Sequence, residues 1–180
     1  MSKELKSALY PPLQAAIKGK SERDAANILI DFVQNSFQYQ TDGEQFGFEK
    51  PFFMDENFYY PACDCEDRAI LFSNLVKDLL GLDAVLLDYP NHIASAVRFN
   101  EDISGDYILL DGIKYLICDP TYIGAPIGMC MDRLKSVPPE IIRKSTQYCN
   151  INIAIRGIFY PELAIIIIFN TSGLFPGVHS

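Results

Sequence analysis

The chain has 180 residues, of which 49% are hydrophobic and 21% charged, as in a globular protein that buries a core without disulfide or metal staples. Its 15 Lys and Arg against 23 Asp and Glu residues give a formal net charge of -8, and the basic residues form no run that could follow a phosphate backbone. This composition excludes a disordered or fibrous chain and argues against nucleic acid as a partner.

The first predicted element is an amphipathic helix over residues 21–37. Apolar residues recur there at steps of three and four, and Ser21 with Asp24 three residues later resembles a capping box. Residues 38–62 show no sustained periodicity and contain two Gly, two Pro and many aromatic residues. We expect a long ordered loop there, which is usually functional in a compact domain. Its aromatic residues either pack the loop down or line a substrate cleft, and packing is expected for most.

The second predicted helix covers residues 66–80. It carries a wide apolar stripe, and Gly81 follows where a helix C-terminus favours a left-handed residue. We therefore expect a largely buried central helix with Cys65 at its N-terminal end.

After Gly81 the hydrophobic pattern changes to that of strands. They are predicted over 84–88, 92–99, 107–110 and 113–118, the last two forming a hairpin around the Asp111-Gly112 pair. Helices followed by an antiparallel sheet predict the α+β fold class.

The segment 151–180 is apolar and nearly uncharged, but it is too short and interrupted for a clear membrane span. We expect residues 1–150 to form the main domain and residues 151–180 an extension of extra strands or poor order. Residues 1–10 lack an apolar core, so no signal peptide is predicted, although a chain cut from a longer precursor could be exported. Localisation and oligomeric state stay open.

Cys65, at the start of the second predicted helix, has the most favourable position for reactivity. The unpaired amides and the dipole at a helix N-terminus stabilise a thiolate and lower its pKa. The same amides can receive the oxyanion of a tetrahedral intermediate. The start of this helix would thus provide both the nucleophile and the oxyanion hole. An odd count of five cysteines, with Cys63 too close to Cys65 for an ordinary mutual disulfide, predicts no disulfide framework.

A thiol nucleophile needs an imidazole that takes its proton and returns it to the leaving group. Of the two histidines, His179 lies in an expected flexible tail, which leaves His92 at the start of an alternating strand. Asp119 closes the strand 113–118, and a carboxylate there needs a partner such as that imidazole. Each residue alone has an ordinary structural explanation. Their order, Cys at a helix start and then His and Asp on successive strands, is the stronger signal.

These motifs resemble the transglutaminase-like superfamily, closest to its bacterial cysteine-proteinase branch. The resemblance covers about residues 21–130 and rests on these residues: Asp64-Cys65-Glu66-Asp67-Arg68-Ala69, Leu80-Gly81-Leu82, His92 and Cys118-Asp119-Pro120-Thr121. It implies a papain-related fold, with residues 1–150 as the catalytic domain and a Cys65-His92-Asp119 triad. The implied activity is hydrolysis of an amide, or acyl transfer, through an acyl-enzyme formed with a protein or peptide substrate.

The chain departs from the family pattern in two ways. Cys63 stands where relatives have Gly, and it either resolves an oxidised Cys65 or is packed, which is the preferred interpretation. No Trp is present, so the oxyanion contact that relatives make with an indole needs another group. Candidates are Gln38, Tyr39, Gln40 and Gln45.

The resemblance also raises the question of calcium, on which some members of the bacterial branch depend. Asp64 and Glu66 match the acids implicated there, but calcium takes roughly 6 to 8 oxygen ligands, so others such as Asp67 or Asp88 would be needed. The preferred interpretation is that Glu66 and Asp67 complement the positive helix end and that no cofactor is required.

Two other functions compete with the enzyme hypothesis. A structural zinc site could use four N and S ligands, although the Cys63-x-Cys65 spacing is shorter than usual for paired zinc cysteines. Its ligands would be Cys63, Cys65, His92 and Cys118. Alternatively, the same fold could serve as a catalytically inactive module that binds peptides or glycans.

Overall fold

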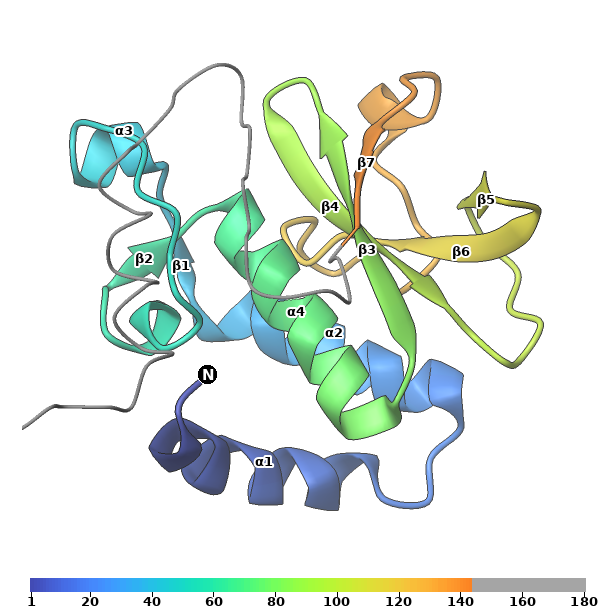
Figure 1. Ribbon diagram of the computed structural model, residues 1–180, viewed down its shortest axis with the longest axis horizontal. Coiled ribbons are helices and arrows are strands. Elements are labelled where there is room, and N and C mark those ends of the chain that lie inside the picture. Colours follow the sequence, from blue (N-terminus) through green and yellow to red (C-terminus); the bar gives the residue numbers. More distant parts are fainter. Residues whose placement is uncertain (144–180) are drawn as a thin grey trace, which may run out of the picture. The chain divides into compact units, whose positions relative to one another are not determined.

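The computed structural model describes residues 1–143. They belong to one compact unit, Met1–Lys144. The predicted extension 151–180, His179 and the end of the predicted main domain lie outside the described residues. Within residues 1–143, helices lie beside an antiparallel sheet, so the predicted α+β class is confirmed (Figure 1).

Two long helices match the predicted ones closely. Helix α2 is Glu22–Ser36, and the Ser21 side chain accepts from the Asp24 amide at 3.1 Å, as the capping pattern indicates. Helix α4 is Cys65–Leu80 and ends at Gly81 with φ 69°, a left-handed conformation that glycine adopts without steric cost. None of the helices in the described part of the chain is long and apolar enough to cross a membrane.

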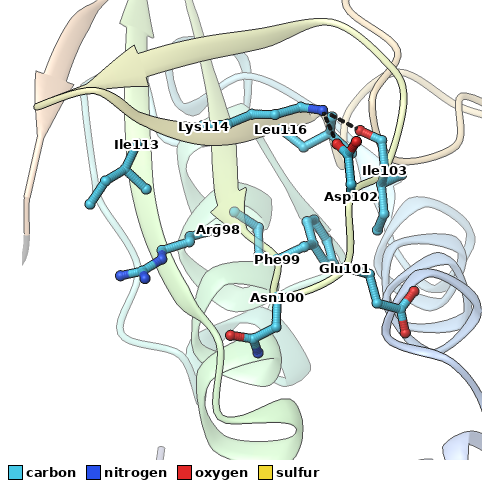
Figure 2. Close-up of a pocket in the computed structure, with 10 residues that line it drawn as sticks. Arg98, Phe99, Asn100, Glu101, Asp102, Ile103, Ile113, Lys114 and Leu116 are labelled. Atoms are coloured by element: carbon cyan, nitrogen blue, oxygen red, sulfur yellow. Dashed lines mark hydrogen bonds and ion pairs between the residues drawn. The ribbon is translucent and has the colours of Figure 1, made fainter.

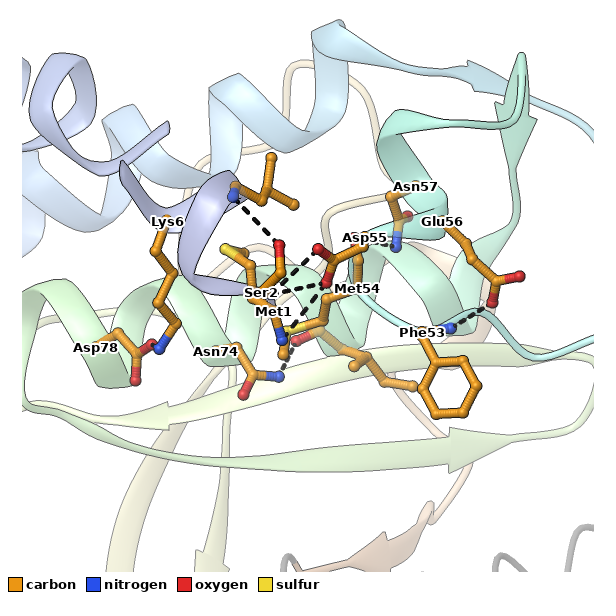
Figure 3. A network of polar contacts seen from close by, with 12 residues as sticks. Met1, Ser2, Lys6, Phe53, Met54, Asp55, Glu56, Asn57, Asn74 and Asp78 are labelled. Carbon is orange, nitrogen blue, oxygen red and sulfur yellow. Dashed lines mark hydrogen bonds and ion pairs between the residues drawn. The ribbon is translucent and has the colours of Figure 1, made fainter. Parts of the chain in front are cut away.

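Helix α1, Lys3–Ile17, was not predicted. It contains Pro11 and Pro12, which lack amide donors and normally argue against a helix interior. Its start is held by Asp55, whose carboxylate accepts from the Ser2 amide at 3.0 Å and pairs with the terminal ammonium at 3.6 Å (Figure 3). Tertiary contacts thus offset the poor local propensity.

The main sheet has the strand order β5-β6-β4-β3-β7, with every neighbouring pair antiparallel. The strands are β3 Asp83–Tyr89, β4 His92–Arg98, β5 Tyr107–Leu110, β6 Ile113–Cys118 and β7 Glu140–Ile142. The first four match the predicted strands within two residues. The predicted β5-β6 hairpin is confirmed, with positive φ at both Asp111 and Gly112, as a type I′ turn requires.

The segment 38–62 was predicted as a loop but contains short elements. These are β1 Gln38–Tyr39, α3 Asp42–Gln45, the 3-10 turn Glu56–Phe58 and β2 Ala62–Cys63, with β1 and β2 paired in parallel. Its aromatic residues divide into two groups. Phe46, Phe52 and Tyr60 pack around Lys50, whereas Phe48, Phe53, Phe58 and Tyr59 are exposed, so packing accounts for only part of the set.

Helix α4 lies at the centre, with the sheet on one side and α2 on the other (Figure 1). Its apolar side chains share one core with α2 and with one face of the sheet. That core includes Leu29, Val33, Phe72, Leu75, Val97 and Leu116. Because β2 runs straight into α4, the burial of this helix fixes where its first residue, Cys65, meets the sheet.

Candidate active site

Cys65 is the first residue of α4 and is 7% exposed. Asp64 is the N-cap residue, and its amide donates to the Asp67 carboxylate three residues on, at 3.4 Å. The Cys65 Sγ accepts a hydrogen bond from the Ile93 amide at 3.4 Å. The thiol therefore lies against the first residues of β4, where Ile93 directly follows His92, the residue predicted as its base.

His92 begins β4, and its Nε2 lies 2.8 Å from Asp119 Oδ2. Both are buried, with 5% and 1% exposure. Asp119 follows β6, which pairs with β4 so that Ser95 lies opposite Cys118. The structure brings His92 and Asp119 into contact, and Nδ1 remains as the ring nitrogen that can exchange a proton with a thiol.

Asp119 is fixed by the turn that follows it. Its Oδ1 accepts from the amides of Thr121 and Tyr122 at 2.9 Å and 3.2 Å. A buried carboxylate is costly unless its lone pairs find donors. Here both oxygens are satisfied, so the orientation of the His92 ring rests on a rigid partner.

Gln34 on α2 anchors the same turn through side-chain hydrogen bonds, and it was not predicted from the sequence. Its Nε2 donates to the carbonyls of Asp119, Tyr122 and Ala125 at 2.9–3.1 Å, and its Oε1 accepts from the Gly124 amide at 3.1 Å. The side chain is only 3% exposed. A glutamine on the apolar side of an amphipathic helix was the available signal, since a buried amide needs partners.

Arg68 connects α2 with α4 beneath the nucleophile. It is 1% exposed and donates to the carbonyls of Phe37 at 2.7 Å and Gln34 at 3.4 Å. Burial raises the pKa of Cys63 to about 11, although the Arg68 guanidinium acts in the opposite direction. Cys63 is therefore a protonated, buried thiol at neutral pH, which fits the packed interpretation.

Burial raises the pKa of Cys65 to about 12, and the nearby carboxylates of Glu66 and Asp64 add to this increase. The hydrogen bond from Ile93 acts against it but is outweighed. Burial and the neighbouring carboxylates thus oppose the lowering of this pKa that was predicted from the helix N-terminus, and the shift is upward. The resting site thus holds a neutral thiol.

A cluster of acids adjoins the thiol. Carboxylate oxygens of Asp42, Glu49 and Glu66 lie within 4.8 Å of one another, as do those of Asp64 and Glu66 with the Cys65 Sγ. Burial, then the charges of nearby acids, raise the pKa of Asp64 to about 6 and of Glu66 to about 8. Asp64 Oδ1 is buried without a hydrogen-bond partner. We call Asp42, Glu49, Asp64 and Glu66 the acid cluster.

The acid cluster could hold a hard cation, which oxygen donors suit. Its members differ from those expected, because Asp67 uses its oxygens to accept from the amides of Phe52 and Asp64. Asp42 and Glu49 take part instead of Asp67 and Asp88. They come from the aperiodic segment 38–62, where spacing gave no hint of their convergence.

The predicted zinc ligands do not assemble. Among residues 1–143, the groups that could share a metal ion are Asp64-Cys65-Glu66 and Asp42-Glu49-Glu66. Neither includes His92, which is bound to Asp119, or Cys118, which is fully buried and donates to the Leu116 carbonyl. The geometry therefore contradicts the zinc alternative.

A pocket of about 240 Å³ lies at the opposite end of β4 and contains no triad residue (Figure 2). Lys114 crosses it and donates to the Asp102 carboxylate at 3.0 Å and the Ile103 carbonyl at 2.7 Å. Its lysine is thus already engaged, and the pocket adds nothing to the chemistry of the triad.

Comparison of the chain with protein-family models, curated proteins and solved structures finds no match. Function is therefore inferred from the geometry of the site.

The first testable prediction concerns Gln34. Replacing it by Ala removes four hydrogen bonds and leaves buried carbonyls unpaired, so the free energy of unfolding should fall by about 2–4 kcal/mol. Urea denaturation measures it. The exposed neighbour Asn35→Ala is the control and should change stability by less than about 0.5 kcal/mol. A Gln34→Ala protein as stable as the control would contradict the bracing role.

The second prediction concerns Glu66. Glu66→Gln removes a charge that raises the pKa of Cys65. At pH 9.5 the wild-type Glu66, with its pKa of about 8, is ionised, so alkylation of Cys65 by iodoacetamide should be about three- to tenfold faster in the variant at that pH. Glu4→Gln, on exposed α1, is the matched control and should leave the rate unchanged. Peptide mapping after timed labelling gives the rate at Cys65. An equal or slower rate in the variant would show that Glu66 does not govern this thiol.

Proposed function

We propose that the protein is a thiol-dependent amide hydrolase or acyl transferase with a papain-related, transglutaminase-like fold. Two observations carry the proposal: Cys65 Sγ accepts from the amide of Ile93, the residue after His92, and His92 is held by buried Asp119 at 2.8 Å. The three residues come from a helix start, a strand start and a strand end. A central helix bearing the thiol, followed by an antiparallel sheet bearing the other two, supports the fold assignment.

The reaction follows from the protonation states. Because the resting thiol is neutral, His92 takes the Cys65 proton as Sγ attacks the substrate carbonyl carbon. Asp119 stabilises the imidazolium that forms. As the tetrahedral intermediate collapses, the C–N bond breaks and His92 passes the proton to the leaving amine, which leaves a thioester. Water or a second amine then attacks the thioester and releases the acyl group.

A peptide- or glycan-binding module of the same fold is the competing proposal. Binding alone gives no reason to bury His92 against a carboxylate with two further amide donors, an arrangement that is expensive to desolvate. The hydrogen bond from the Ile93 amide to Cys65 also keeps the thiol beside the strand that carries His92, which an inactive binding module would not require. We therefore propose catalysis over binding alone, and a protein or peptide as the substrate class.

Calcium is a second proposal, and a specific feature favours it. The orphan Asp64 Oδ1 and the crowded carboxylates of Asp42, Glu49 and Glu66 are an unfavourable arrangement for a cluster without a cation. Bound Ca²⁺ would supply positive charge that offsets the carboxylates next to the thiol. The chain's own residues carry out every step of acyl transfer above.

The third prediction tests the nucleophile. With p-nitrophenyl acetate as a generic acyl donor, the wild type should release a burst of nitrophenolate, and Cys65→Ala should abolish it. His92→Gln should slow the burst by at least about 100-fold. Cys63→Ala is the matched control, since that thiol is packed, and should retain the burst. Stopped-flow absorbance measures all four proteins. A full burst from Cys65→Ala would show that Cys65 is not the nucleophile.

The fourth prediction tests the cation. At pH 8, millimolar Ca²⁺ should raise the Tm of the wild type by several degrees, as any ligand of the folded state does. The variant Glu49→Gln should lose most of this rise, whereas Glu4→Gln should keep it. Calorimetric scans with and without Ca²⁺ measure the shift. An unchanged Tm in the wild type, or an equal rise in Glu49→Gln, would contradict calcium binding at the acid cluster.

A further inference from the structure

Tyr39 is brought to the nucleophile by the small parallel strand pair. In β1-β2 it lies opposite Cys63, and β2 continues through Asp64 into Cys65. The pairing therefore lays Tyr39 beside the segment that delivers the thiol, although the two are far apart in the sequence. Figure 1 shows β1 and β2 next to the N-terminal end of α4.

The ring of Tyr39 rests on a rigid support. Its centroid lies 5.6 Å from the Arg68 guanidinium carbon, within range of a cation–π contact. Arg68 is three residues after Cys65 on α4, so both side chains leave the same face of the helix one turn apart. Because Arg68 is buried and hydrogen-bonded to two carbonyls, its guanidinium is a fixed support for the Tyr39 ring, one helical turn from Cys65.

The hydroxyl of Tyr39 is available as a donor. The residue is 51% exposed, and within residues 1–143 its hydroxyl has no hydrogen-bond partner. Burial of part of the ring raises the pKa of Tyr39 to about 12, and an electrostatic interaction with Cys65 is the next largest cause. The phenol therefore keeps its proton at neutral pH and can donate it in a hydrogen bond.

The other upstream candidates fit less well. Gln38 and Gln40 flank Tyr39 in an extended segment, so their side chains point to the opposite side of the strand. Gln45 lies on α3 and its Oε1, an acceptor, is buried without a partner. Of the four, Tyr39 combines a position opposite Cys63, two residues before Cys65, with a hydroxyl donor that has no partner among residues 1–143.

We propose that Tyr39 is a catalytic residue whose hydroxyl donates a hydrogen bond to the oxyanion formed when Cys65 attacks a carbonyl; this rests on the proposed function. In that step the S–C bond forms, the carbonyl π pair moves to oxygen, and the thiol proton passes to His92. The negative oxygen needs donors that are already in place. Amides at the start of α4 supply one side, and Tyr39 supplies the other.

Two reactions of the same thiol separate this role from a general effect on Cys65. Acylation by p-nitrophenyl acetate passes through an oxyanion: the S–C bond forms and p-nitrophenolate leaves, giving a thioester. Alkylation by iodoacetamide forms an S–C bond as iodide leaves, without addition to a carbonyl. Tyr39→Phe keeps the ring over Arg68 and removes only the hydroxyl, so it should slow acylation about 10- to 100-fold and change alkylation less than about twofold.

Tyr59→Phe is the matched control, because Tyr59 is 81% exposed on the same segment and should change neither rate. Acylation by Tyr39→Phe at the wild-type rate overturns the proposal. An equal fall in both rates also overturns it, since Tyr39 would then act on the thiol rather than on the oxyanion. A wild type without Cys65-dependent acylation, which Cys65→Ala reveals, instead overturns the proposed function and the Tyr39 role with it.

Discussion

The buried hydrogen bond between His92 and Asp119 is the constraint around which the site is built. Removing a carboxylate and an imidazole from water is expensive, and the cost is offset only when every lone pair finds a donor. Asp119 meets that condition through His92 and two amides of the turn that follows it. Gln34 fixes that turn to α2, and Arg68 fixes α2 to α4, the helix that carries the thiol. Packing and chemistry are therefore linked by one polar network.

The sequence predicted the parts of this network that carry local signals. Cys65 follows a helix cap, His92 follows the turn residues Pro90 and Asn91, and Asp119 ends an apolar strand, so each position shows in a short window. Gln34 was missed because its four partners lie far along the chain and are set by tertiary structure. Asp42 and Glu49 were missed for a related reason, since an aperiodic segment does not reveal which side chains converge. Helix α1 was missed because Pro11 and Pro12 mask its pattern.

The pKa of Cys65 shows how competing effects must be weighed. A helix N-terminus stabilises an anion by about 0.3–1 kcal/mol near the surface. Desolvation and like charges act more strongly in a buried site, and here they hold the thiol neutral. The acids beside Cys65 therefore reduce its reactivity by raising its pKa. Neutralising Glu66 or Asp64 would lower that pKa and make the thiol more reactive. Position at a helix start alone was insufficient to predict the protonation state.

The central claim is that Cys65 forms an acyl-enzyme. The most direct test is to quench the wild type during reaction with an activated ester at low pH, digest it, and map the acylated residue by mass spectrometry. An acyl-enzyme at Cys65 predicts a thioester on the peptide that contains Cys65, formed at least about 100-fold more slowly by His92→Gln. An acyl group on a different cysteine, or none on any, would contradict it.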